Sequence, residues 1–215
     1  DVMPKLSEDG KRAVTIFISA TIVFTTLAYV AVTPRPKEQF FQIYVLGETR
    51  KAERYYPNNN PNIPVGQVVK WYVGTTNFMG SVQYVVIKVK FGNSTIKAPD
   101  DVNYVPSPAP ALLQFKRVLM NNETWEFPFT WMMKEITVDG SAVNPALLEI
   151  NGVEVRNSQV GALKGYNFRI VFELWTFNPE NESLVFGWRT GADRRVAWLQ
   201  IWFNATSQAI RQPAL

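Results

Sequence analysis

The sequence predicts an antiparallel β-sandwich that follows a single transmembrane helix. Residues 13–32 form an apolar run without a charged side chain, whereas later segments alternate apolar and polar residues with the period of a β-strand. Pro- and Asn-rich stretches separate these segments, and no amphipathic helical pattern follows residue 32. About seven short strands with such turns are typical of two packed sheets.

The apolar run at residues 13–32 has the length of a membrane span. Its 20 residues rise about 1.5 Å each and therefore cover about 30 Å, the thickness of the hydrocarbon core. Basic residues flank the run on both sides, and no small-x-small cleavage motif follows it. The run is therefore predicted to be a retained helix in contact with membrane lipid rather than a cleaved signal peptide. Residues 1–12 form its flank, and residues 33–215 form the folded domain.

The location of the domain is inferred from glycan-acceptor motifs, because both flanks of the helix are basic and the positive-inside rule does not decide. Four Asn-x-Ser/Thr motifs follow the helix, at Asn93, Asn122, Asn181 and Asn204. They predict N-linked glycans and a single-pass protein of the cell membrane with an extracellular C-terminal domain.

The expected strands follow the alternating pattern along the domain. They are residues 40–46, 67–77, 81–91, 123–131, 166–177 and 194–204, with a further short strand at 184–188. The second and third are expected to pair as a hairpin because a short turn joins them. Pro128 has no N–H for a ladder and therefore places its strand at an edge or a bulge, with Trp125, Phe127 and Phe129 pointing inward.

Three segments are expected to be loops or insertions. Residues 55–66 are rich in Asn and Pro and predict a surface loop. Residues 97–111 are Pro-rich and extended. Residues 134–165 are polar, and they contain a small hairpin, residues 147–155, that turns at Asn151 and Gly152.

Composition excludes most common catalytic and binding chemistry. The chain has 215 residues, no Cys and no His, so thiolate and imidazole sites of every kind are absent. The net charge of +4 is weak and dispersed and gives no argument for nucleic acid binding. No cofactor or metal is predicted, and the protein is expected not to be an enzyme.

Four groups of side chains are candidates for sites. Asp100, Asp101 and Asn103 supply only part of a calcium shell, and a solvated loop is favoured. A glycosidase-type pair of Glu123 with Glu126, or of Glu173 with Glu149, is disfavoured because nothing fixes the separation. Arg194 and Arg195 beside Asp193 are interpreted as a solvated turn rather than an anion contact. The aromatic candidates for sugar stacking lie at strand spacing, which favours the core; they are Trp125, Trp131, Trp175, Trp188, Trp198 and Trp202.

Two segments resemble a known family. They are YVLGETRKAERYYP at residues 44–57 and NNETWEFPF at residues 121–129. Their order, within a likeness over about residues 33–205, resembles the C-terminal extracytoplasmic domain of the DUF1616 family of archaeal membrane proteins. The resemblance implies an immunoglobulin-like sandwich outside the membrane and no known activity. The chain departs from the family in having one helix, and in reading TTNFMG at residues 75–80 where the family has Asn-His-Glu.

These observations predict an N-glycosylated, membrane-anchored accessory subunit that contacts protein partners in a larger membrane or cell-surface complex. A carbohydrate-binding module of the envelope is the alternative, and a carboxylate-based hydrolase is the third hypothesis.

Overall fold

The computed structural model describes residues 7–33, 38–156, 160–189 and 193–206. The chain divides into two units, Asp1–Glu38 and Gln39–Leu215. Residues 1–6 of the predicted flank and residues 157–159 of the predicted 134–165 insertion lie outside the described residues.

The first unit contains one helix, α1, over Glu8–Val32. Ser7 caps it by accepting a hydrogen bond from the Gly10 N–H at 3.2 Å, and Glu8 and Asp9 lie in the first turn, where the helix dipole favours negative charge. Its threonine hydroxyls, such as that of Thr21, donate to the helix's own carbonyls and so remain satisfied without water. None of its residues is buried, and the helix is long and apolar enough to cross a membrane.

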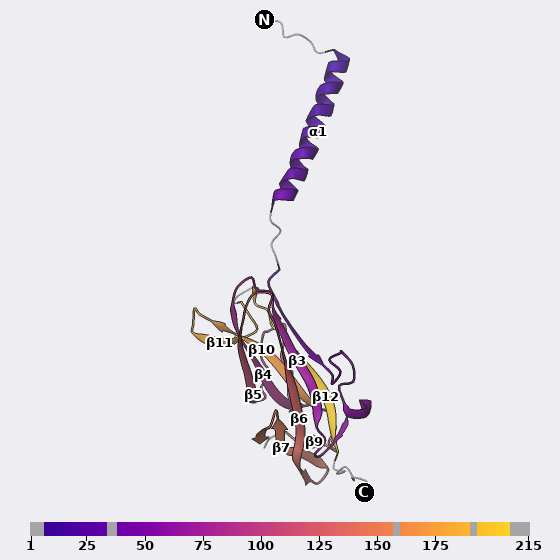
Figure 1. The fold of residues 1–215 in the computed structure, drawn as a ribbon, viewed down its shortest axis with the longest axis vertical. Coiled ribbons are helices and arrows are strands. Elements are labelled where there is room, and N and C mark those ends of the chain that lie inside the picture. The colour runs from indigo at the N-terminus through magenta and orange to yellow at the C-terminus, as the bar shows by residue number, and fades with distance from the viewer. Residues whose placement is uncertain (1–6, 34–37, 157–159, 190–192, 207–215) are drawn as a thin grey trace. The chain divides into compact units, whose positions relative to one another are not determined.

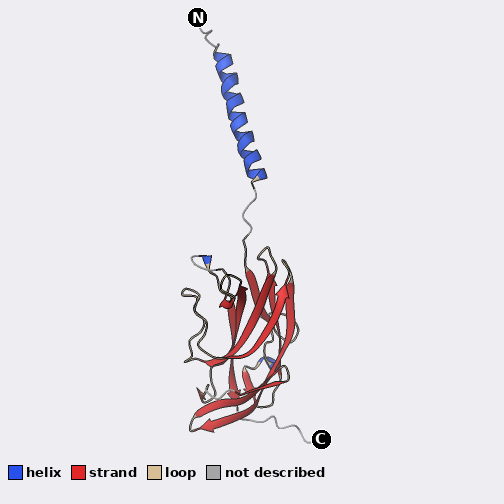
Figure 2. Cartoon of the chain, turned by 90° about the vertical axis from the view of Figure 1, so that its left-hand side faces the viewer, coloured by secondary structure: helices blue, strands red, loops and turns tan. Residues whose placement is uncertain are grey.

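The second unit is a β-sandwich of two sheets (Figures 1 and 2). One sheet has the order β1-β3-β6-β7-β8, with β9 paired to β7, and the other has the order β2-β12-β10-β4-β5, with β11 paired to β10. Every pairing is antiparallel except that of β2 with β12. The strands are β1 Phe41–Leu46, β2 Asn62–Pro64, β3 Val69–Asn77, β4 Gln83–Asn93, β5 Ala111–Leu119, β6 Thr124–Asp139, β7 Ala142–Ile150, β8 Val153–Arg156, β9 Ala162–Leu163, β10 Phe168–Asn178, β11 Ser183–Phe186 and β12 Trp198–Thr206; a short 3-10 helix covers Pro57–Asn59.

The connections give this sandwich an immunoglobulin-like topology. The chain passes from β1 to β3 in one sheet, crosses to β4 and β5, returns to β6, and crosses again to β10 and β12. β12, β10, β4 and β5 therefore occupy the places of strands G, F, C and C′ of an immunoglobulin domain, opposite β1, β3 and β6 as A, B and E. The predicted fold class is confirmed.

The predicted hairpin of β3 with β4 is wrong. β4 pairs with β10 and β5, whereas β3 pairs with β1 and β6 in the other sheet. Residues 78–82 therefore cross between the sheets. A connection of this length closes a hairpin or bridges two packed sheets equally well, so its length does not reveal which one forms.

The prediction of an insertion at residues 134–165 is also wrong for most of its length. β6 continues to Asp139, and β7, β8 and β9 follow it in the same sheet. The hairpin at Asn151 and Gly152 forms as predicted, between β7 and β8. The rest of the segment is polar because this part of the sheet is solvated on one face, where Lys134 and Glu154 form an ion pair of 2.5 Å.

Pro128 lies where β6 has a neighbour on one side only among the described strands. β6 pairs with β3 up to Trp131 and with β7 from Trp131 onward. The Pro128 carbonyl accepts from the Asn151 side chain at 3.0 Å, so this residue turns its polar groups away from β3. The missing N–H therefore removes no ladder bond, and the edge prediction is confirmed for the first half of β6.

Aromatic side chains fill the space between the sheets. Trp71, Phe129, Trp131 and Phe172 are at most 1% exposed, and Trp71 lies within 5.5–6.3 Å of the other three rings, measured between centroids. Phe127 and Phe129 point inward as predicted, and Trp125 is half-buried. Ten aromatic residues of the domain are thus buried in its core.

Candidate functional site

The carboxylates considered as catalytic pairs are held by cations and do not face one another as pairs. Glu123 lies 3.1 Å from Arg117, and Glu126 lies 3.5 Å from Arg50. Glu126 also accepts a hydrogen bond from Tyr44 at 3.3 Å. Burial, followed by the charge of Glu126, raises the pKa of the Tyr44 hydroxyl.

The second candidate pair, Glu149 with Glu173, is divided between the two sheets. Glu149 lies on β7 and pairs with Lys134 at 3.5 Å, whereas Glu173 lies on β10. Within the described residues, no group of three or more acidic side chains is placed to hold a metal ion.

In the acidic loop considered as a calcium site, the Asp100 carboxylate bonds to groups of the loop itself. Asp100 accepts hydrogen bonds from the backbone N–H groups of Val102 and Asn103 and from the Asn103 side chain, at 2.7–2.9 Å. These bonds, that of the Asn103 side chain first, lower the pKa of the Asp100 carboxyl. Asp101 accepts from the indole N–H of Trp198. The oxygens are thus used to close a loop.

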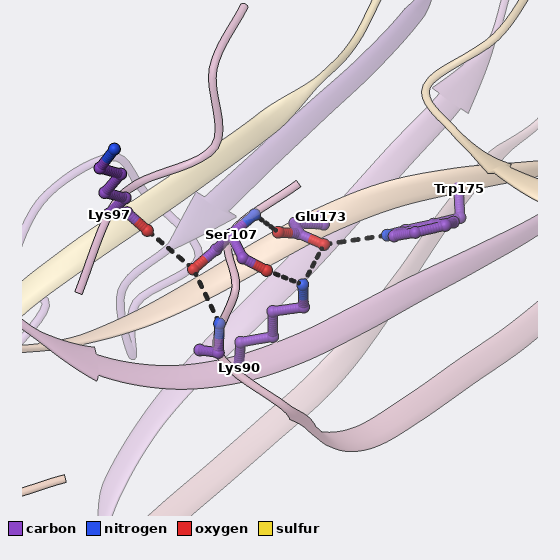
Figure 3. A network of polar contacts seen from close by, with 6 residues as sticks. Lys90, Lys97, Ser107, Glu173 and Trp175 are labelled. Carbon is purple, nitrogen blue, oxygen red and sulfur yellow. Dashed lines mark hydrogen bonds and ion pairs between the residues drawn. The ribbon is translucent and has the colours of Figure 1, made fainter. Parts of the chain in front are cut away.

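Glu173 is the centre of a buried polar network (Figure 3). Its carboxylate lies 3.0 Å from the Lys90 ammonium, and both side chains are almost completely inaccessible. Glu173 also accepts from the backbone N–H of Ser107 at 2.8 Å and from the indole N–H of Trp175 at 3.0 Å. Lys90 donates its other described bond to the Ser107 carbonyl at 2.6 Å.

This network fastens residues 94–110, here called the outer segment, over the outward face of the second sheet. Besides the contacts of Ser107, Arg169 of β10 donates to the carbonyl of Ile96 in the same segment. Burial lowers the pKa of the Arg169 guanidinium. The carboxylate and the ammonium both have their hydrogen-bonding partners within the protein, so the network is a structural clasp and does not resemble an open catalytic site.

The edge of the clasp carries a partly exposed lysine. Lys88 lies over the ring of Trp175, with its ammonium 3.3 Å from the ring centroid. Burial, and then the neighbouring charge of Lys90, lower the pKa of Lys88, whereas Glu173 opposes the shift. The indole of Trp175 therefore bonds to Glu173 at its edge and contacts a cation at its face.

The tryptophans considered for sugar stacking lie mostly in the core or against it. Trp131 and Trp188 are buried, and Trp125, Trp175 and Trp198 are half-buried. Trp202 is the most accessible of them at 37%, and the Arg169 guanidinium lies 4.8 Å from its ring centroid. Only one of the six candidate indoles is therefore exposed, whereas a sugar-binding surface needs several exposed aromatic rings side by side.

The residues Arg194 and Arg195 do not form an anion site with Asp193. Arg194 contacts the ring of Tyr104 at 5.5 Å and donates to the Phe186 carbonyl at 3.4 Å. Arg195 pairs its backbone with Trp188 across a β-bridge. Arg194 is thus half-buried against the domain, and the interpretation of the segment as a solvated turn stays a prediction because residues 190–192 lie outside the described part.

A groove opens along one edge of the sandwich, here called the edge groove. Its volume is about 710 Å³. Its walls come from the start of β1 and from the approach to β12, and the lining residues are Phe40, Phe41, Gln42, Ile43, Phe78, Asp101, Val196, Ala197 and Trp198. β1 pairs only with β3, and β12 pairs with β2 only over Asn204–Thr206, so among the described strands both walls present an edge without a partner. Mostly apolar walls with free strand edges suit an extended or apolar protein segment.

The four glycan-acceptor asparagines fall into two groups. Asn122 and Asn181 are exposed, and the structure gives their amide nitrogens no partner among the described residues. Asn93 is only 7% exposed, and its amide nitrogen donates to the Gly161 carbonyl at 2.6 Å. Asn204 is half-buried, and its nitrogen donates to Asn62 at 2.8 Å. A glycan on the Asn93 nitrogen would have to break this bond at a residue that is nearly inaccessible, so the fold disfavours it.

Two further features were not found from the sequence. β5 was missed because apolar and polar residues do not alternate clearly along it. Phe115 and Arg117 lie on the same face of the strand, and its exposed positions include both apolar and basic side chains. The Lys90–Glu173 clasp was missed because its partners are 83 positions apart (173 minus 90) in the chain. The available signal was the presence of charged residues within two mostly apolar strands, Lys88 and Lys90 in β4 and Arg169 and Glu173 in β10.

The fold and these sites define an all-β domain of immunoglobulin-like topology, preceded by an apolar helix. No known protein family and no curated protein matches the sequence. Among solved structures, the CARDB domain of a Pyrococcus furiosus protein, in complex with di-metal ions, is 10% identical, with a TM-score of 0.37 over 81% of this chain and 100% of that one. The β-glucosidase of Listeria innocua is 10% identical over 79% of this chain, with a TM-score of 0.34, and the β-D-glucoside glucohydrolase of Trichoderma reesei is 12% identical over 85%, with a TM-score of 0.31. This chain covers 17% and 22% of those two glucosidase chains. Similarities this low carry no argument about function.

Proposed function

We propose that this protein is a single-pass membrane protein whose domain lies outside the cytoplasm and serves as an accessory interaction subunit of a larger membrane or cell-surface complex. The observation that carries this proposal is the edge groove, whose lining side chains are mostly apolar and which lies between two strand edges that have no partner in the described chain. The resemblance of the chain to the DUF1616 domain and the apolar helix α1 both support a membrane-anchored domain outside the cytoplasm.

We propose no catalytic role, because the carboxylates considered for it are paired with Arg50, Arg117, Lys134 and Lys90. Envelope carbohydrate binding has weaker support, because it would have to rely on Trp202 alone for stacking. The protein partner is expected to be apolar at its contact surface, since the groove walls are mostly apolar.

Placing a charge in the edge groove is expected to release the partner. Phe40 is 41% exposed and lies 4.8 Å from the ring of Phe78, so Phe40→Glu puts a carboxylate against the apolar wall. The loss of an aromatic contact at an interface centre costs about 2 kcal/mol or more, which is roughly a thirtyfold loss in affinity. The measurement is the stoichiometry of subunits that co-purify in mild detergent from the native membrane.

Val153→Glu is the matched control, because Val153 is 49% exposed but lies in the β7–β8 hairpin, away from the groove. It is expected to leave the partner bound. Recovery of wild-type chain as a clean monomer, or equal recovery of the partner with both variants, would contradict the proposed site.

Glycan occupancy is expected to follow the accessibility of the amide nitrogen. Glycopeptide mass spectrometry of the native protein should find glycans at Asn122 and Asn181 and none at Asn93, whose nitrogen is enclosed and bonded to Gly161. Asn204 is expected to be modified little, because its nitrogen is held by Asn62. A glycan at Asn93 contradicts the accessibility argument, whereas four unmodified asparagines would count against the extracytoplasmic location.

A further inference from the structure

The two strand edges beside the edge groove carry no charged side chain. β1 reads FQIYVL, and residues 198–203 of β12 read WLQIWF. Other strands at the margins of the two sheets are charged, since β5 contains Lys116 and Arg117, and β8 contains Glu154 and Arg156. Charges on an edge strand discourage pairing with another chain. The edges of β1 and β12 therefore lack this protection against a further strand.

The register of β1 shows which of its backbone groups are free. The Phe40 carbonyl accepts a hydrogen bond from the backbone N–H of Phe78 at 3.0 Å, so the even-numbered residues of β1 bond to β3. The odd-numbered residues Phe41, Ile43 and Val45 alternate with them and direct their N–H and C=O groups away from β3. No described strand pairs with this side of β1. A row of backbone donors and acceptors thus lies along the groove.

Two adjacent tyrosines close the far end of both edges. The Tyr55 hydroxyl donates to the outward carbonyl of Val45 in β1 at 3.2 Å. The Tyr56 hydroxyl donates to the carbonyl of Trp202 in β12. Each hydroxyl satisfies an acceptor that an added strand would otherwise use. The open part of the β1 edge therefore runs over residues 41–45, which is about 17 Å of strand.

The side chains that line the groove are mainly apolar. Val196, Ala197 and Trp198 form its wall on the β12 side. Among the lining residues, all of which the structure describes, Asp101 is the one charged side chain, and its carboxylate accepts a hydrogen bond from the Trp198 indole. The groove thus offers apolar contact along one wall and unpaired backbone groups along the other.

An extended chain is the occupant that satisfies both walls. Covering the groove removes water from the backbone groups of Phe41 and Ile43, and a buried N–H or C=O without a partner costs about as much as a lost hydrogen bond. A helix cannot supply the partners, because its interior N–H and C=O groups bond to one another. An extended segment has free backbone groups along its edge and turns every second side chain to the same side.

We propose that the edge groove binds an extended segment of a partner subunit, which adds to β1 as a further strand of the first sheet. The segment exchanges backbone hydrogen bonds with Phe41 and Ile43 and places apolar side chains, at every second position, against Ala197 and Trp198. This inference rests on the proposed function and specifies the form that the partner takes at the groove. The tyrosine caps limit the paired part to about five residues.

Hydrogen exchange of backbone amides tests the added strand in the wild-type chain. The full-length chain that co-purifies with its partner in mild detergent is compared with full-length chain produced without it. The Ile43 amide is expected to exchange at least about tenfold more slowly in the complex, because the added strand accepts its hydrogen bond. The Gln42 amide bonds to β3 and is expected to be protected equally in both samples. Equal exchange at Ile43 in both samples, with the partner bound, overturns the proposal.

A pair of substitutions at Ile43 separates the backbone contribution from that of the side chain. Ile43→Pro removes the outward N–H but no bond to β3, and proline is tolerated in an edge strand. Ile43→Ala keeps the N–H and retains less hydrocarbon than proline. The fraction of partner retained on dilution of the complex is expected to indicate about tenfold weaker binding for Ile43→Pro than for Ile43→Ala.

The same series distinguishes failure of this inference from failure of the proposed function. Release of the partner by Phe40→Glu, with equal retention by Ile43→Pro and Ile43→Ala, overturns strand addition but leaves the groove as the partner site. Retention by all three variants contradicts the proposed function itself. The urea midpoints of the two Ile43 variants are expected to agree; if Ile43→Pro unfolds earlier, the exchange rates of the wild-type chain decide.

Cross-linking identifies the occupant. The chain has no Cys, and Gln42 is exposed and lines the groove, so Gln42→Cys can carry a maleimide–diazirine cross-linker in the native complex. Mass spectrometry is expected to find the cross-link on a different protein, in a segment with an apolar residue at every second position. A cross-link to a second copy of this chain, or to another part of the same chain, overturns the proposed occupant.

Discussion

Replacing Lys90 by methionine is expected to lower the free energy of unfolding by about 3–5 kcal/mol, because it leaves the Glu173 carboxylate buried without its cation. The carboxylate is completely inaccessible and lies 3.0 Å from the Lys90 ammonium. For a domain of this size, such a loss lowers the melting temperature by roughly 10 °C. Urea unfolding and thermal melting in detergent, followed by tryptophan fluorescence, measure the change.

The double variant Lys90→Met with Glu173→Gln separates the charge effect from the packing effect. Glutamine removes the charge but keeps an oxygen that can accept from the Ser107 N–H or from the Trp175 indole. Most of the lost stability is therefore expected to return. Glu149→Gln is the surface control, because the Glu149–Lys134 pair is partly exposed, and a change below about 1 kcal/mol is expected. If Lys90→Met and Glu149→Gln cost the same, the clasp is not a coupled buried pair.

The clasp also shows where prediction from sequence stops. The sequence predicts which residues of β4 face the core, because Val85, Ile87 and Val89 recur with the period of a strand. It does not predict that the opposite face is buried too, under the outer segment. Lys90 therefore looks like an ordinary solvated residue until the fold brings Ser107 and Glu173 to it.

Strand pairing was the other limit. Alternation finds β3 and β4 but does not reveal that they belong to different sheets, because pairing depends on partners far along the chain, such as β10 for β4. The local hairpin at Asn151 and Gly152 was predictable, since its signal is a turn dipeptide rather than a distant partner.

Sequence patterns identified the candidate site residues, and their burial in the structure separates accessible candidates from inaccessible ones. The motif at Asn93 has the same form as that at Asn122, yet only the fold encloses the Asn93 nitrogen. The edge groove had no sequence signal at all. It is formed by residues that are separate in the chain and become neighbours through the fold, as Phe40 and Phe78 do.

Replacing Trp71 by alanine is expected to destabilise the domain by about 3–5 kcal/mol, the range for removing a buried aromatic side chain. Trp71 is fully buried, its ring lies within 6.3 Å of those of Phe129, Trp131 and Phe172, and the substitution leaves a cavity among them. It also removes the indole donor of a 2.5 Å hydrogen bond to the Tyr55 carbonyl. Urea unfolding of the full chain in detergent measures the loss.

Trp71→Phe and Trp202→Ala separate the contributions to this loss. Phenylalanine keeps most of the packing and gives up the bond to Tyr55, so a cost of about 1–2 kcal/mol is expected. Trp202 is 37% exposed and covers little of the core, so its removal is expected to cost less than either Trp71 variant. An equal loss for Trp71→Ala and Trp202→Ala would mean that the two sheets do not meet around Trp71. The immunoglobulin-like packing of β3 and β6 against β10 would then be wrong, because Trp71, Phe129 and Phe172 are the residues through which those strands touch.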